Sequence, residues 1–325
     1  MGLHVRLFAP SAHTYAPLGE LDERPFAQIC HPSPATCILL SMPFQPTYDV
    51  PAERRPYLIP STNGNKTIGC LVLHGFMGSP GSSRPLAHFL AERGITTHAP
   101  LLPGHGHWPD KLYKVSHRQW LAAAEEALAD FSQQVDEIVL VGHSMGAVLG
   151  SHLIVKHGEK HPIRGIVMLS PVYEIPDGRL KLMRYLRYVM PWFYPHKSRS
   201  MQKLVRERVL DFYPDFDFDD PANQARLPAI ARLPTGALDE MVRMVVLGRE
   251  KLFPRLGETA VLIFQGAHDP AILPGTHRKV YDLIPSPHKH IEVFPDAGHE
   301  LMRPFEPIHT TVWDMIQSFI QHHTQ

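Results

Sequence analysis

Short apolar runs alternate with longer amphipathic stretches along most of this chain. The runs typical of buried strands are IGCLVLHG (68–75), EIVLVG (137–142), GIVMLS (165–170), TAVLIFQG (259–266) and KHIEVF (289–294). The stretches with helical spacing are residues 83–94, 116–134, 145–158 and 308–321. This alternation predicts an α/β fold, in which a mostly parallel central sheet carries helices on both faces.

Residues 171–256 interrupt the alternation, because they contain helical patterns but no clear buried strand. In RLKLMRYLRYVM (179–190) one helical face collects Leu182, Met183, Leu186, Val189 and Met190. Pro191 then ends the helix. We expect a helical lobe inserted between two strands, with a solvated basic face. At most, this lobe makes a peripheral contact with a membrane surface.

The predicted organisation has three parts. Residues 1–66 are rich in Pro, Ser and Thr and form an N-terminal extension. Residues 67–170 and 257–325 form the α/β core, and residues 171–256 form the insertion between its two halves. A chain of 325 residues is long enough for one large domain of this kind.

Composition narrows the classes of partner. Lys+Arg and Asp+Glu number 32 each, so no net charge favours nucleic acid. No apolar run approaches the roughly 20 residues of a membrane-spanning helix. The three cysteines, Cys30, Cys37 and Cys70, have no metal-ligand spacing and are interpreted as reduced thiols, so we expect a cytoplasmic location. The sequence does not predict the oligomeric state.

One acidic segment superficially resembles a calcium loop. Asp215, Asp217 and Asp219 have the alternating spacing of such a loop. However, Asp220 stands where the loop needs glycine, and Arg226 stands where it needs a bidentate glutamate. No calcium site is therefore expected here.

The segment VLVGHSMGAVLG (139–150) places a serine between two glycines, after a strand pattern and before a helix pattern. A tight strand-to-helix turn exposes the hydroxyl of Ser144, and Gly142 and Gly146 avoid collisions with neighbouring backbone. The positive end of the following helix favours developing negative charge. The pattern predicts a nucleophilic serine.

Such a serine needs donors for an oxyanion. The segment LVLHGFMGS (71–79) ends a strand and then turns, so the backbone N–H groups of Phe76 and Met145 are predicted to form the oxyanion hole. His74 is interpreted as a residue that stabilises this loop, although it could be mistaken for the catalytic base.

The serine also needs a base and an acid, which follow it in the order acid, then histidine. Asp269 comes directly after the strand pattern AVLIFQG, and His299 lies in DAGHE before the last helix pattern. Carboxyl ends of parallel strands gather active-site groups. We therefore expect His299 to take the proton of Ser144, and Asp269 to hold the imidazole tautomer.

Other residues stay open for these two roles. Glu174 and Asp177 follow the strand pattern that ends at Ser170, so either is an alternative acid. His268 is an alternative base, but its place beside Asp269 makes a triad geometry awkward.

From Ile68 to its C-terminus the chain resembles the α/β-hydrolases of the carboxylesterase and monoacylglycerol lipase group. The matching stretches are LHGFMGSP (73–80), APLLPGHG (99–106), VGHSMGAVLG (141–150), FQGAHDP (264–270) and DAGHE (296–300). The resemblance implies the α/β-hydrolase fold, a helical cap at 171–256, and neither metal nor cofactor. It also implies that GHGH (104–107), despite its metal-like histidines, is a structural loop near the site.

The N-terminal stretch departs from this resemblance. Similar bacterial esterases begin a short way before the LHGF strand, and MPFQPTYDVP (42–51) would be a natural start. We therefore expect residues 1–41 to be an added tail or the product of an upstream, mis-assigned start codon.

A serine nucleophile favours acyl transfer to water. The predicted function is hydrolysis of small-molecule or lipid esters with short to medium acyl chains, monoacylglycerols among them. Aromatic side chains that pack the cap or line an acyl tunnel are Tyr185, Tyr188, Trp192, Phe193, Tyr194, Phe212, Phe216 and Phe218. The alternatives are a carbon–carbon bond hydrolase, a lactonase or an acyltransferase with the same triad, and a ligand-binding protein without catalysis.

Overall fold

Parallel strand pairing organises the main sheet of this protein. The computed structural model describes residues 46–62, 68–174, 182–202, 205–206, 209–210, 213 and 215–324. Among these residues, seven strands form one sheet in the order β1-β3-β2-β4-β5-β8-β9. The strands are β1 Tyr57–Ile59, β2 Ile68–Leu73, β3 Ile95–Ala99, β4 Glu137–His143, β5 Ile163–Leu169, β8 Ala260–Gly266 and β9 Lys289–Phe294. Only the β1–β3 pair is antiparallel within this described sheet.

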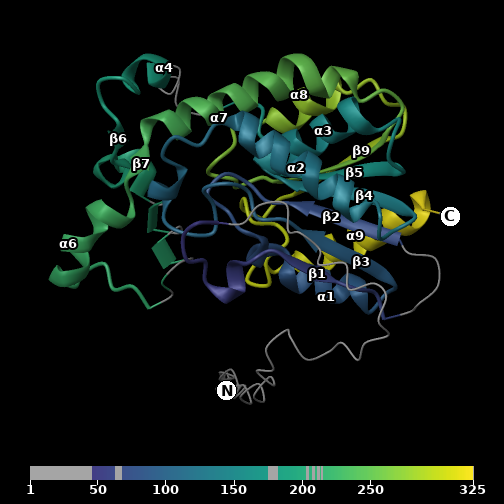
Figure 1. The fold of residues 1–325 in the computed structure, drawn as a ribbon, viewed down its shortest axis with the longest axis horizontal. Coiled ribbons are helices and arrows are strands. Elements are labelled where there is room, and N and C mark those ends of the chain that lie inside the picture. The colour runs from purple at the N-terminus through teal and green to yellow at the C-terminus, as the bar shows by residue number, and fades with distance from the viewer. Residues whose placement is uncertain are drawn as a thin grey trace, which may run out of the picture. The chain divides into compact units, whose positions relative to one another are not determined.

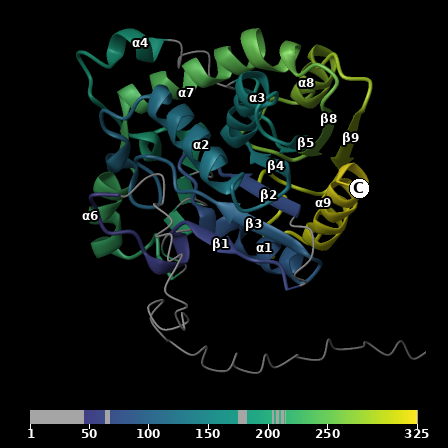
Figure 2. The same ribbon diagram turned by 45° about the vertical axis from the view of Figure 1, so that its right-hand side comes forward.

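Helices cover both faces of the sheet, as Figures 1 and 2 show. On one face α1 (Arg84–Ala91) and α9 (His309–His323) bury Leu86, Leu90, Val312 and Ile316 against alternate strand residues such as Val72. On the other face lie α2 (His117–Phe131), α3 (Met145–His157) and α8 (Thr276–Leu283). The predicted α/β fold with two covered faces is confirmed.

Three elements of this core, β1, β3 and α8, have no clear signal in the sequence. The strand β3 reads ITTHA, yet Thr96, Thr97 and His98 are all buried. Pairing with β1 on one side and β2 on the other buries them, and β-branched threonine suits a strand. His98 also bonds through Nδ1 to the carbonyl of Tyr57 at 2.8 Å.

The predicted boundary between the N-terminal extension and the core needs correction. Strand β1 lies inside the predicted extension 1–66, and its Tyr57 pairs with Ala99 of β3. The core therefore begins before residue 57 rather than at 67. The expectation for residues 1–41, and the cysteines Cys30 and Cys37, lie outside the described residues.

The chain between β5 and β8 contains most of the remaining elements. These are α4 (Met183–Leu186), β6 (Trp192–Phe193), α6 (Pro221–Ile230), β7 (Leu233–Pro234) and α7 (Thr235–Leu247), followed by a π-helical turn (Gly248–Leu252). Strands β6 and β7 form a small antiparallel pair, which the sequence pattern does not predict. In Figure 1, α7 runs from the side of α4 and α6 across the core helices.

The helix predicted over 179–190 is shorter than expected in its described part. Helix α4 has four residues, and Met183 is buried, whereas Leu182 and Val189 are 54% and 79% exposed. The expected apolar face is thus only partly covered. Among the described residues, no helix has the length and apolar character needed to cross a membrane.

Candidate active site

Ser144 occupies a strained turn between β4 and α3. Its backbone has φ 54° and ψ −113°, a conformation that a non-glycine residue rarely adopts. Its N–H donates to the carbonyl of Leu169 at 2.8 Å, which fixes the turn to β5. A Cβ added at Gly146 would lie 1.9 Å from the carbonyl oxygen of Leu73, so only glycine fits there. A strained strand-to-helix turn of this kind is what the sequence predicts for a nucleophilic serine, whose catalytic role stays a prediction.

The loop after β2 lies directly beside this turn. A Cβ added at Gly75 would be 3.1 Å from the Cβ of Ser144. Within the described part of the chain, neither Phe76 N–H nor Met145 N–H donates to another group. Met145 is also the first residue of α3, whose N-terminus carries partial positive charge. The two amides proposed for the oxyanion hole thus flank the serine.

His74 holds the shape of this loop. Its Nε2 accepts the N–H of Leu102 at 3.2 Å, and its Nδ1 lies 2.9 Å from the carbonyl of Gly75. One neutral ring satisfies both contacts when Nδ1 carries the proton and Nε2 accepts. His105 of the GHGH segment packs beside it, with ring centroids 5.0 Å apart. This geometry supports a structural role for His74.

Neither metal-like pattern gathers a ligand set. Within the described ranges, no group of three His, Cys, Asp or Glu side chains is arranged to hold a metal ion. In the acidic segment, Asp220 instead caps α6 by accepting the N–H of Ala222 at 2.9 Å.

Asp269 and His299 are joined by a hydrogen bond of 2.7 Å from Nδ1 to Oδ2. The other carboxylate oxygen of Asp269 accepts the N–H groups of Ala271 and Ile272, and Gln265 donates to Oδ2 at 2.9 Å. Burial opposes ionisation of Asp269, but these bonds, led by that from His299, hold its pKa below the ordinary value. The ionised acid therefore fixes the imidazole with its Nε2 available for a proton.

The structure places His299 next to the nucleophile turn. The carbonyl of His299 accepts a hydrogen bond from Nε2 of His143, the residue before Ser144, and the two imidazole rings are 4.7 Å apart. The hydrogen bonds found among the described residues do not include one between the hydroxyl of Ser144 and the imidazole of His299. The predicted acid and base are therefore hydrogen-bonded to each other, and their triad with Ser144 remains a prediction.

The alternative acids and base have other positions. Glu174 forms an ion pair with Nζ of Lys279 at 2.8 Å, and Asp177 lies outside the described residues. His268 is exposed, and its backbone N–H donates to the carbonyl of Ala297 at 3.0 Å. The hydrogen bond between Asp269 and His299 favours the predicted pair over these alternatives.

Three contacts of the site were not foreseen from the sequence: Gln265 on Asp269, and His143 and Ser170 on the carbonyl of His299. His143 could have been noticed, because it is the variable residue of the G-x-S-x-G pattern. Gln265 is the next-to-last residue of β8 and Ser170 directly follows β5, but neither carries a pattern of its own.

Apolar residues of the predicted cap pack on the loop that follows β2. Met183, Leu233 and Leu238 form a buried apolar cluster, and Phe76 and Met77 pack against it. Leu186 and Phe193 are the other half-buried members. Among the other aromatic residues named above, Phe216 and Phe218 belong to a separate cluster that includes Trp108. The side chains of Tyr185 and Tyr188 are exposed. Phe212 lies outside the described residues. The surface that packs against Phe76 and Met77 is therefore apolar.

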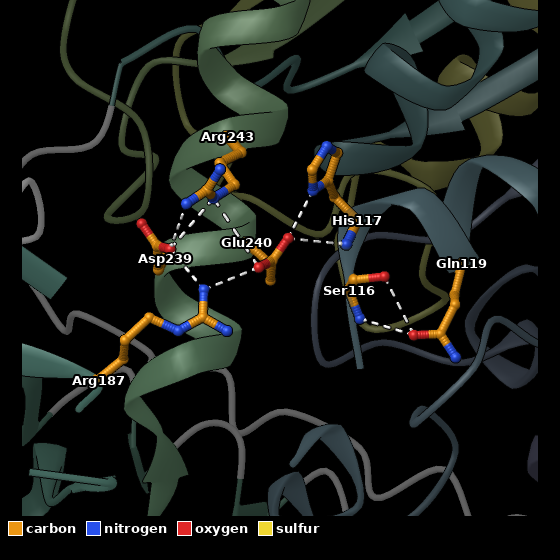
Figure 3. Close-up of polar contacts among 7 residues, drawn as sticks. All are labelled: Ser116, His117, Gln119, Arg187, Asp239, Glu240 and Arg243. Carbon is orange, nitrogen blue, oxygen red and sulfur yellow. Dashed lines mark hydrogen bonds and ion pairs between the residues drawn. The ribbon is translucent and has the colours of Figure 1, made fainter. Parts of the chain in front are cut away.

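A group of charged side chains ties the cap to the core (Figure 3). Nη1 of Arg187, which follows α4, lies 2.7 Å from Asp239 and 2.9 Å from Glu240 of α7. Arg243 also donates to Asp239, at 3.0 Å. The other oxygen of Glu240 accepts the backbone N–H of His117 at the start of α2. Burial opposes ionisation of Glu240, but hydrogen bonds from Nδ1 and the backbone N–H of His117, followed by the bond from Arg187, lower its pKa.

One cavity of about 360 Å³ lies beside the loop that follows β2. Its lining includes Met77 and Ser79 of that loop and Arg303 and Phe305 from beyond His299. Neither Ser144 nor the acid–base pair lines it, so we do not assign it to the reacting groups.

Comparison with known proteins agrees with this fold. Residues 65–307 match the family described as serine aminopeptidase, S33. The chain is 29% identical over 242 residues to the thermostable monoacylglycerol lipase of Bacillus sp. (strain H-257), covering 72% of this chain and 84% of that protein. It is 23% identical over 257 residues to a carboxylesterase of Bacillus subtilis (strain 168), covering 78% and 93%.

A solved structure from work on the metagenome-derived lipolytic enzymes LipS and LipT has the same fold. It superposes with a TM-score of 0.67 at 21% identity, covering 85% of this chain and all of that one. The family match spans the nucleophile turn, Asp269 and His299. The chain is therefore an α/β-hydrolase that belongs to the serine aminopeptidase S33 family.

Proposed function

We propose that this protein hydrolyses carboxylic esters through an acyl-enzyme formed on Ser144. The observation that carries the proposal is the 2.7 Å hydrogen bond between Asp269 and His299, on a loop that packs against the residue preceding a strained serine turn. Similarity to a monoacylglycerol lipase and a carboxylesterase supports an ester as the substrate.

In the proposed reaction, the hydroxyl of Ser144 attacks the ester carbonyl while Nε2 of His299 accepts its proton. The ionised Asp269 stabilises the imidazolium that forms. The amides of Phe76 and Met145 donate to the oxyanion. Collapse breaks the bond to the alcohol, which leaves with the proton from His299. A water molecule, activated by the same imidazole, then releases the acid and restores the hydroxyl.

This reaction requires a hydrogen bond between Ser144 and His299. His143, the neighbour of Ser144, already bonds the main-chain carbonyl of His299, so we expect the two side chains to meet when substrate binds. Catalytic hydrogen bonds are often loose without substrate and tighten in the complex. We therefore assign Ser144, Asp269 and His299 as the triad.

The proposed substrates have short to medium acyl chains and include monoacylglycerols. The apolar cluster of Met183, Leu233 and Leu238 against Phe76 and Met77 gives the approach to Ser144 the character of an acyl-binding surface. The similarity to a monoacylglycerol lipase supports a glycerol ester among the substrates.

The exposed end of the cap supports peripheral contact with the lipid phase that carries such substrates. Tyr185, Tyr188 and Val189 are between 62% and 83% exposed around α4, and large exposed apolar groups mark interaction surfaces. Co-sedimentation with phosphatidylcholine vesicles tests this contact, and equal binding of the Tyr188→Ser and Val189→Ser double variant would rule it out. A cytoplasmic location also remains a prediction, and cell fractionation tests it.

A series of p-nitrophenyl esters from acetate to dodecanoate tests the activity, run beside the Ser144→Ala variant. We expect turnover that is highest for short or medium chains and absent in the variant. Release of glycerol from a 1-monoacylglycerol tests the lipid substrate. No turnover of any ester, or full activity in Ser144→Ala, would contradict the proposal.

The same panel distinguishes the alternative functions. A diketone, a lactone and an added acceptor alcohol report carbon–carbon hydrolysis, lactonase activity and acyl transfer. An alanyl p-nitroanilide reports the peptidase activity that the family description names. Labelling of Ser144 by a fluorophosphonate excludes a protein that only binds ligand.

A further inference from the structure

The main-chain carbonyl of His299 accepts two side-chain hydrogen bonds. Nε2 of His143 donates to it at 3.0 Å, and Oγ of Ser170 donates at 3.3 Å. Both side chains are deeply buried, with His143 3% exposed and Ser170 fully enclosed. Because a carbonyl oxygen has two lone pairs, these two donors satisfy it completely.

Both donors are fixed to the strands that hold the nucleophile. His143 is the last residue of β4 and directly precedes Ser144. Ser170 directly follows β5, and its N–H donates to the carbonyl of Phe264 in β8 at 2.8 Å. Ser170 has φ 47°, a conformation that costs free energy in a non-glycine residue and persists only where surrounding contacts impose it.

The loop that carries His299 is also attached after this residue, because Leu301 and Met302 are buried in the core and the carbonyl of Glu300 accepts the N–H of Arg303 at 3.0 Å. The side chain is held by Asp269, and two residues earlier the carbonyl of Ala297 accepts the N–H of His268 at 3.0 Å. Asp269 sets the tautomer and tilt of the ring, but it does not fix the ring's distance from Ser144. That distance depends on the backbone at 299.

We propose that His143 and Ser170 are positioning residues that hold the backbone of the catalytic histidine at its working distance from Ser144. This proposal rests on the proposed function. His143 does not act as a base, because its Nε2 proton is donated to the carbonyl of residue 299. It acts by tying the histidine loop to the residue next to the nucleophile.

Three variants separate positioning from packing. His143→Gln keeps an N–H donor near the position of Nε2, whereas His143→Leu fills similar space without a donor. Ser170→Ala removes the longer bond alone. The matched control is His98→Leu, because His98 is also buried on a strand and bonds a main-chain carbonyl, that of Tyr57, at 2.8 Å.

The measurements are kcat and KM on a p-nitrophenyl ester, the rate of fluorophosphonate labelling, the melting temperature, and the low-field proton NMR signal of the bond between His299 and Asp269. A misplacement approaching 1 Å costs about 100-fold in rate. We expect His143→Leu to lower kcat by about 10- to 100-fold with little change in KM, and His143→Gln to recover most of it. Ser170→Ala should lower kcat only several-fold.

The control and the spectrum complete the test. His98→Leu should lower the melting temperature and leave kcat and the low-field signal unchanged, whereas His143→Leu should shift or broaden that signal. Wild-type kcat in folded His143→Leu, or equal losses in the leucine and glutamine variants, would overturn the proposal. If His143→Leu does not fold, unchanged kcat in Ser170→Ala overturns it.

Failure of the proposed function gives a different pattern. If the wild-type protein hydrolyses no ester, the reaction assignment fails. The labelling rates and the NMR signals of the variants still report whether His143 and Ser170 position His299.

Discussion

Replacing Gly75 by alanine tests the proposed oxyanion loop with a single methyl group. The added Cβ would lie 3.1 Å from the Cβ of Ser144 and 3.2 Å from the carbonyl oxygen of His143. Carbon atoms pack best at about 3.5 to 4.0 Å, so the loop must retreat from the serine by about 0.4 Å. Phe76, the proposed donor, is the next residue and moves with it.

The size of the effect follows from this displacement. If about 1 Å costs about 100-fold in rate, and the logarithm of the rate falls in proportion to distance, 0.4 Å costs roughly six-fold. We expect kcat of Gly75→Ala to fall between about 5- and 20-fold. Overpacking should lower the free energy of unfolding by about 1 to 3 kcal/mol, so the protein still folds. By contrast, Gly146→Ala should not fold, because its Cβ would overlap the carbonyl of Leu73 at 1.9 Å.

The assay is kcat and KM for p-nitrophenyl butyrate, together with urea unfolding followed by circular dichroism. The matched control is Gly236→Ala on α7, where the added Cβ meets only the flexible guanidinium of Arg187, at 3.3 Å from Nη2. This control should keep wild-type kcat and gain up to about 1 kcal/mol from better helix propensity. Wild-type kcat in folded Gly75→Ala would show that this loop does not shape the oxyanion hole.

Three further changes give distinct outcomes. Asp269→Asn should lower kcat by about 10,000-fold on the ester substrates, because the amide no longer stabilises the imidazolium of His299; a loss under 10-fold would remove it from the triad. Arg187→Met should lower the free energy of unfolding by about 1 to 3 kcal/mol, because the buried carboxylates of Asp239 and Glu240 lose a cation. The cap should then be cleaved faster in limited proteolysis. Unchanged cleavage would contradict the anchoring role of Arg187. The pKa of Glu125 is lowered to about 2, because hydrogen bonds from His152 and Lys156 outweigh the burial that opposes ionisation. Glu125→Gln should therefore lower the free energy of unfolding by about 1 kcal/mol at pH 7. This difference from wild type should disappear as pH falls from about 4.5 towards 2, because Glu125 becomes protonated. A stability difference that persists at pH 2 would refute this.

The sequence predicts this fold well where strands are apolar and buried on both faces. The five strand patterns lie on β2, β4, β5, β8 and β9, and four helical patterns lie on α1, α2, α3 and α9. It fails for β3, because Thr96, Thr97 and His98 are buried by the arrangement of neighbouring strands rather than by their own hydrophobicity. The sequence does not predict β1 either, because a strand of three residues is too short to show a periodic pattern.

Some residues of the proposed site can also be predicted from the sequence, whereas others cannot. Ser144, Asp269 and His299 are recognisable because strand ends and glycine spacing mark their positions. Ser170 and Gln265 are not, because the hydrogen bonds they make are created by the meeting of strands far apart in the chain. Periodicity also overestimates how much of the apolar face around α4 is buried. Met183 is buried, but the side chains of Leu182 and Val189 are exposed.

The cap residues that face Phe76 and Met77 have a consequence for laboratory evolution of this enzyme. A library that enlarges the acyl space by truncating Leu233 or Leu238 also removes support from the segment that carries a proposed oxyanion donor. Gains in substrate range should therefore arrive together with slower turnover. Recovery should come from compensating substitutions at Phe76 or Met77, so productive libraries should vary both sides of this contact at once.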